Sequence, residues 1–147
     1  MRRLLIVFVF LIACNGIAQS IDYNIKKGYV AAGYDVVAYF NNEAIMGNKE
    51  YTLEYDNVKF KFSSDENLNK FKENPVAYIP KYGGYCAYAV AIASKKVKIN
   101  PKTFEIRDGE LFLFYNSGKN NTLKLWQNKS PQTLKIKADE NWERIKN

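Results

Sequence analysis

An alternating pattern between Tyr51 and Phe62 constrains the fold of this chain more than any other feature. Apolar side chains occupy every second position on each side of Asp56-Asn57, a dipeptide that suits a two-residue turn. The pattern therefore predicts a β-hairpin in which one face is apolar and the other charged. The apolar face pairs Tyr55 with Val58, Leu53 with Phe60 and Tyr51 with Phe62, and the charged face pairs Glu54 with Lys59 and Thr52 with Lys61.

A second hairpin is expected between Thr103 and Tyr115. Its turn is Asp108-Gly109, which is a favoured tight-turn dipeptide. The register predicted by this turn pairs Ile106 with Leu111, Phe104 with Leu113 and Arg107 with Glu110. A further strand is expected within residues 33–40, where a turn leads into the β-rich run Val-Val-Ala-Tyr-Phe.

Capping signals and apolar spacing predict the helices. Ser63 and Glu66 form a capping-box pattern for a first helix, which the Asn74-Pro75 step ends. The remaining helical segments are a short turn over 75–78, a central helix over about 84–94, a short helix carrying Leu123, Leu125 and Trp126, and a final helix that Ser130 caps with Pro131 at its first position. Its buried stripe is expected to be Leu134, Ala138, Trp142 and Ile145.

These elements predict an α+β fold in which the two hairpins form one small antiparallel sheet packed with about four helices. The chain has 147 residues and 47% apolar content, which suits a single compact domain with its own core.

The first 19 residues have the pattern of a signal peptide. Arg2 and Arg3 precede an apolar run of about ten residues, which is too short to span a bilayer. Cleavage near Ala18 to Ser20 is expected, and Leu11-Ile12-Ala13-Cys14 also resembles a lipobox in which Cys14 would be lipidated. Both routes predict export to the periplasm or envelope, with membrane attachment only through such a lipid anchor.

The formal charge is +7, and the chain contains no histidine. The lysines are scattered without a dense basic run, which argues against nucleic-acid binding. The absence of histidine removes the commonest general base and metal ligand, so we expect a protein that is not an enzyme.

The segment Tyr82 to Ile92 holds the candidate chemistry. It combines a glycine pair with three tyrosines and Cys86, the single cysteine outside the N-terminal segment. Cys86 with Met46 could ligate copper(I) or another soft metal, although so few ligands favour no cofactor at all. A small ligand could instead bind among side chains gathered around this segment, for which the candidates are Asp35, Tyr39, Tyr82, Tyr85, Cys86 and Tyr88.

Several motifs together resemble the YHS domain, and more narrowly the exported bacterial YHS-domain proteins. The matching pieces are residues 33–40, Phe60 to Ser64, Phe71, Pro75, Tyr78, Pro80, Tyr82 to Val90, Asp108-Gly109-x-Leu111 and Trp126. The resemblance covers residues 30–145 and implies a small α+β unit. Relatives in metal-handling proteins are thought to bind metal through cysteines, whereas this chain has Ser63 and Ser64 near the strand end.

The sequence thus predicts an exported, YHS-type binding module for an unidentified small ligand, soft metal or envelope protein. Two alternatives stay open. Cys86 could serve a thiol-dependent redox protein or enzyme, or the chain could be purely a protein-interaction module of the cell envelope.

Overall fold

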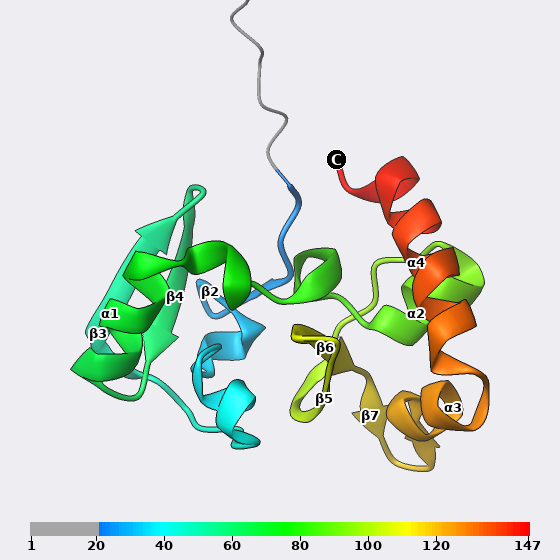
Figure 1. Cartoon of the computed structure of the whole chain (residues 1–147), viewed down its shortest axis with the longest axis horizontal. Coiled ribbons are helices and arrows are strands. Elements are labelled where there is room, and N and C mark those ends of the chain that lie inside the picture. The colour runs from blue at the N-terminus through cyan, green and yellow to red at the C-terminus, as the bar shows by residue number, and fades with distance from the viewer. Residues whose placement is uncertain (1–20) are drawn as a thin grey trace, which may run out of the picture.

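The computed structural model describes residues 21–147, which form two lobes lying side by side (Figure 1). The N-terminal lobe, residues 23–79, contains β1 (Ile25–Lys26), β2 (Tyr29–Val30), β3 (Asn48–Tyr55), β4 (Val58–Phe62) and α1 (Asp65–Glu73). The C-terminal lobe, residues 80–147, contains α2 (Ala87–Ala93), β5 (Asn100–Arg107), β6 (Glu110–Phe114), β7 (Asn116–Ser117), β8 (Asn120–Asn121), α3 (Thr122–Asn128) and α4 (Pro131–Ile145). The expected α+β class is confirmed.

The first hairpin forms with the predicted register near its turn and departs from it farther away. Tyr55 lies opposite Val58 and Leu53 opposite Phe60, as expected, and both charged-face pairs are also confirmed. Phe62, however, lies opposite Asn48 rather than Tyr51, because the strand is irregular between Asn48 and Thr52. The predicted pairing of Tyr51 with Phe62 is therefore wrong.

The strand predicted within residues 33–40 is also wrong. Residues 31–33 and 38–41 form two short 3₁₀ turns instead. Asp35 lies between these turns, and its Oδ1 accepts hydrogen bonds from the backbone N–H groups of Val37 and Ala38. These local bonds hold the backbone in a turn, which is incompatible with an extended strand.

The first helix begins one residue later than the capping-box pattern indicated. The Ser64 side chain, not that of Ser63, accepts the hydrogen bond from the Asn67 N–H that caps α1. The predicted end is confirmed, because α1 ends at Glu73 and residues 75–77 form the expected short turn.

The central helix is shorter than predicted. Residues 81–84 form a 3₁₀ turn, and α2 begins only after Cys86, which occupies its N-cap position. The second hairpin has the predicted register, and α3 and α4 occur where expected, although the Ser130 side chain makes no capping hydrogen bond. Leu134, Ala138 and Trp142 of α4 are buried as predicted.

The two hairpins do not join into one sheet. Over residues 21–147, each hairpin forms a separate two-stranded sheet, as do the small pairs β1–β2 and β7–β8. β6 instead links the lobes through its two faces: Leu111 and Leu113 belong to the apolar cluster of the N-terminal lobe, and Phe112 and Phe114 to that of the C-terminal lobe.

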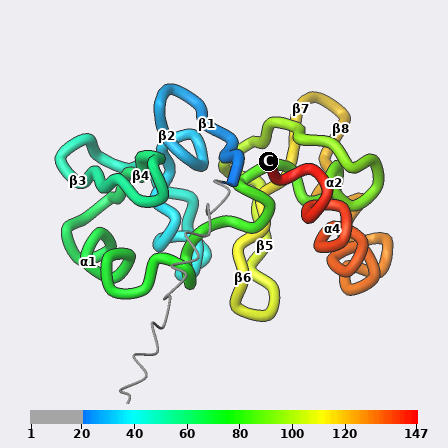
Figure 2. Tube along the Cα trace, turned by 90° about the horizontal axis from the view of Figure 1, so that it is seen from above, coloured from blue at the N-terminus to red at the C-terminus, as the bar shows by residue number. Residues whose placement is uncertain are grey.

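The two ends of the described chain meet at the boundary between the lobes. The Asp22 N–H donates a 2.9 Å hydrogen bond to the carbonyl oxygen of Lys146, and Figure 2 shows the C-terminus beside the start of the described chain. Within residues 21–147, no helix is long and apolar enough to cross a membrane.

Candidate functional site

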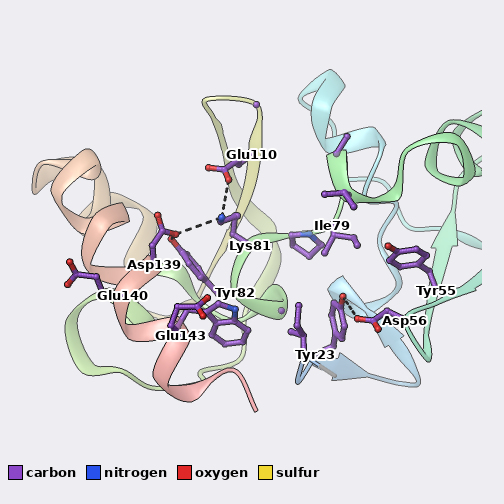
Figure 3. A pocket seen from close by; sticks show the side chains of 17 residues that line it. Tyr23, Tyr55, Asp56, Ile79, Lys81, Tyr82, Glu110, Asp139, Glu140 and Glu143 are labelled. Carbon is purple, nitrogen blue, oxygen red and sulfur yellow. Dashed lines mark hydrogen bonds and ion pairs between the residues drawn. The ribbon is translucent and has the colours of Figure 1, made fainter. Parts of the chain in front are cut away.

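A cavity of about 750 Å³ opens where the two lobes meet (Figure 3). We call it the junction pocket. Its walls come from the tip of the β3–β4 hairpin, residues 76–83, the turn of the β5–β6 hairpin and one side of α4. Because the pocket needs both lobes, its residues are widely separated in sequence.

Aromatic rings form much of the pocket wall. Tyr23, Tyr55, Tyr82 and Trp142 line it, and the Tyr82 and Trp142 rings pack edge to face with centroids 6.0 Å apart. The Tyr23 hydroxyl donates a 3.0 Å hydrogen bond to Asp56, and the Tyr82 hydroxyl donates one of 3.0 Å to Asp139. Burial and these carboxylates raise the pKa of both tyrosines, so both phenols are neutral donors.

An ion-pair network crosses the C-terminal side of the pocket. Lys81 Nζ lies 3.0 Å from Glu110 and 3.8 Å from Asp139, and Lys135 Nζ lies 3.1 Å and 3.2 Å from the same two carboxylates. Burial opposes the charge on Lys135, but the hydrogen bonds to Glu110 and Asp139 raise its pKa above the ordinary lysine value. The network holds the β5–β6 turn against α4.

The charge of the lining is opposite to that of the whole chain. Five carboxylates and one lysine line the pocket, although the chain carries a formal charge of +7. Lys81 and Lys135 balance Glu110 and Asp139, and Lys146 pairs with Glu143 at 2.6 Å. Asp56, on the opposite wall, has no cationic partner in the described part of the chain, so negative charge remains in the pocket.

The glycine pair of the central segment positions this wall. Gly83 has a φ of +60°, and a Cβ at this position would lie 2.3 Å from the carbonyl oxygen of Asp22. The Gly83 carbonyl also accepts a 2.8 Å hydrogen bond from the Asn24 N–H. Close contact between residues 22–24 and Gly83 therefore brings Tyr23 and Tyr82 to the same pocket.

Of the six predicted ligand-binding residues, Tyr82 lines the junction pocket. Asp35 is 0% exposed and accepts hydrogen bonds from Ser63 and Asn67 within the N-terminal lobe. Its oxygens are occupied by protein donors.

The other predicted tyrosines lie elsewhere. Tyr39 is fully buried and donates a 2.6 Å hydrogen bond to the Pro101 carbonyl, and burial raises its pKa. Tyr85 packs beside Trp142 and donates to Asp22, and Tyr88 accepts a hydrogen bond from Lys129. The predicted cluster of tyrosines around one pocket does not form.

Cys86 is 0% exposed inside the core of the C-terminal lobe. Its Sγ lies 3.3 Å from Thr122 Oγ1, and because that hydroxyl donates to the Tyr115 carbonyl, the thiol is the donor. Met46 is 54% exposed beside Tyr34, so the structure does not place the two proposed metal ligands together. Among residues 21–147, no group of three or more Cys, Asp or Glu side chains is arranged to hold a metal ion. Cys14 lies outside the described residues.

Sequence reasoning missed most of the pocket. The sequence predicts Asp56 in a turn and Trp142 in a buried stripe, and both predictions are correct for the local structure. Their second role depends on how the lobes pack, which spacing along the chain does not encode. One usable signal was the row Lys135, Asp139 and Glu143, which places a lysine and two carboxylates four residues apart along one side of a helix.

In comparisons with known proteins, no protein-family model, curated protein or solved structure matches the chain.

Proposed function

We propose that this chain is an exported, non-enzymatic binding module of the YHS type that holds a small organic cation in the junction pocket. The observation that carries the proposal is an aromatic cavity with excess carboxylate on a chain that is otherwise basic. Export is supported by the signal-like pattern of residues 1–19, and intact-mass analysis of envelope protein would test it by the loss of that segment.

Each part of the pocket suits one part of such a ligand. Tyrosine and tryptophan faces attract cations through their ring quadrupoles and also bury apolar surface. Asp56 adds an unpaired carboxylate beside the Tyr23 hydroxyl. A ligand with an apolar body and one positive charge would contact both, and the cavity of about 750 Å³ is in the range of small-molecule sites.

Trp142 provides a direct measurement of binding. It lines the pocket, whereas Trp126, the other tryptophan, is fully buried in the core and does not. We would titrate the protein with benzyltrimethylammonium and follow tryptophan fluorescence, using benzyl alcohol and benzoate as neutral and anionic ligands with the same ring. The expected result is a saturable change for the cation that is weaker for the alcohol and absent for the anion.

Two matched variants test the role of Asp56. Asp56→Asn removes the charge while keeping an oxygen that can accept from Tyr23, and it should weaken cation binding about fivefold. Asp108→Asn removes the same charge from the equivalent position of the other hairpin turn, at the same φ of 52° and outside the pocket lining. Equal effects of the two variants, or equal binding of all three ligands, would refute the proposal.

A further inference from the structure

We propose that a second cavity at the boundary between the lobes is a binding site for a compact oxyanion of the phosphate type. This cavity, which we call the lysine pocket, has a volume of about 470 Å³. Three lysines line it, Lys26 from the N-terminal lobe and Lys98 and Lys102 from the C-terminal lobe, and no carboxylate is present in the lining. Its charge is therefore opposite to that of the junction pocket.

The three lysines are not neutralised by neighbours. In the described part of the chain, none of them forms an ion pair, whereas Lys81 and Lys135 beside the junction pocket pair with Glu110 and Asp139. Three like charges around one cavity repel one another in the absence of a counter-ion. Binding of a doubly charged anion would relieve this repulsion.

Neutral donors in the same lining are also unused. Tyr34 and Tyr115 line the pocket, and the hydroxyl group of neither forms a hydrogen bond within residues 21–147. A phenol hydroxyl is a good donor to a phosphate oxygen. The pocket thus has three lysines without an ion pair and two phenols without a hydrogen bond among residues 21–147.

The backbone that carries two of these lysines is fixed by the surrounding protein. The buried Tyr39 hydroxyl donates a 2.6 Å hydrogen bond to the Pro101 carbonyl, and the Cys86 N–H donates to the Val97 carbonyl at 2.9 Å. Asn100 uses its side chain to accept from the Lys102 N–H at 3.0 Å. The backbone at Lys98 and Lys102 is therefore set before any ligand binds, which lowers the entropic cost of ordering this segment on binding.

The donors favour a phosphate over a monocarboxylate, because a phosphate presents more oxygens and more charge to three separate ammonium groups. Such a group could be free phosphate, a soluble phosphate ester or the headgroup of an anionic lipid. The proposal concerns this shared chemistry and is independent of cation binding in the junction pocket.

The test is a titration with inorganic phosphate at constant ionic strength, followed by amide chemical shifts. Saturable shifts are expected at the amides of residues 98–100, of Lys102 and of residues 115–117. The triple variant Lys26→Gln, Lys98→Gln, Lys102→Gln should raise the Kd about tenfold, since exposed ion pairs contribute modestly. The control is the triple variant Lys59→Gln, Lys72→Gln, Lys137→Gln, which removes the same charge from exposed lysines outside the pocket and should leave the Kd unchanged.

Co-sedimentation with phosphatidylcholine vesicles that contain phosphatidic acid distinguishes the sources. The lipid headgroup is the ligand if the protein sediments with the vesicles, if the first triple variant abolishes this sedimentation and if free phosphate competes with it. Saturable phosphate shifts without sedimentation would identify a soluble phosphate as the ligand. Shifts that do not saturate, or a Kd that both triple variants raise equally, would overturn the proposal, because either result means general attraction to a basic surface.

Discussion

Asp35 is the most heavily hydrogen-bonded carboxylate of the N-terminal lobe. Its Oδ1 accepts from Val37 and Ala38, and its Oδ2 accepts from the Ser63 N–H at 2.8 Å, the Ser63 hydroxyl at 2.6 Å and Asn67 Nδ2 at 2.7 Å. A fully buried carboxylate is stable only when donors of this kind compensate for its lost hydration. Asp35 therefore connects the 35–38 turn to the end of β4 and the start of α1.

We predict that Asp35→Asn lowers the free energy of unfolding by about 3 kcal/mol, because it removes a buried charge that accepts several hydrogen bonds. The new amide group would also face donors rather than acceptors. Urea unfolding followed by circular dichroism measures the change. Asp108→Asn, on an exposed turn, should change the same quantity by less than about 0.5 kcal/mol. If Asp35→Asn lowered the free energy of unfolding by less than about 1 kcal/mol, as little as the control variant does, Asp35 would not be a structural anchor.

At the scale of single elements, turn chemistry explains what could be predicted. Asp56-Asn57 and Asp108-Gly109 adopt the positive φ values that two-residue turns require, and the pairs next to them have the predicted register. The register fails near Gly47, where a Cβ would lie 2.5 Å from the Lys61 side chain. This close approach across the hairpin is a tertiary constraint that alternation does not reveal.

The region 33–40 shows the opposite failure, in which a strong local pattern misleads. Its valines and aromatics favour strands, but Asp35 bonds the following backbone N–H groups and holds a turn. Those apolar side chains are still buried, as Val36, Val37 and Tyr39 show. The pattern thus predicted burial correctly and secondary structure wrongly.

The 3₁₀ turn at residues 81–84 gives the second prediction. Gly83→Ala should lower the free energy of unfolding by about 3 kcal/mol, because it combines a left-handed φ with an overlap on the Asp22 carbonyl. It should also weaken cation binding, since the contact of residues 22–24 with Gly83 brings Tyr23 to the junction pocket. Chemical denaturation and the Trp142 fluorescence titration measure the two effects.

Gly118→Ala is the matched control for the backbone. Gly118 has a φ of +58°, nearly that of Gly83, but a Cβ there would meet no atom within 4 Å. This variant should lose only about 1 kcal/mol, the cost of the left-handed conformation itself. If the two alanine variants were equally stable, the close approach at Gly83 would not be a constraint on the fold.

For the molecule as a whole, the α+β class was predictable but the arrangement of the hairpins was not. The expected sheet would have joined the hairpins by backbone hydrogen bonds, whereas each hairpin packs through side chains. Both candidate pockets follow from this packing, because both take residues from the two lobes. Tyr82 was predictable from its unusual glycine-rich context, but Tyr23 and Asp56 join it only through the contact of the lobes.

The position of β6 gives the third prediction, which concerns cooperativity. Its leucines pack in the N-terminal lobe and its phenylalanines in the C-terminal lobe, so neither core is complete without this strand. We therefore expect one unfolding transition for both lobes. Tryptophan fluorescence reports on the C-terminal lobe, because Trp126 and Trp142 both belong to its cluster, and hydrogen exchange of β4 and α1 amides reports on the N-terminal lobe.

Two leucine variants sharpen the test. Leu113→Ala removes a β6 side chain from the N-terminal core, and Leu134→Ala removes an α4 side chain from the C-terminal core. For each variant, the urea midpoint measured by fluorescence and the midpoint measured by hydrogen exchange should fall by the same amount. Leu113→Ala should lower the free energy of unfolding by about 3 kcal/mol, because Leu113 is fully buried. If Leu113→Ala shifted only the exchange of β4 and α1 while the fluorescence transition stayed in place, the lobes would unfold independently. The junction pocket would then lie between two separately stable units, and the strand between them would not couple their cores.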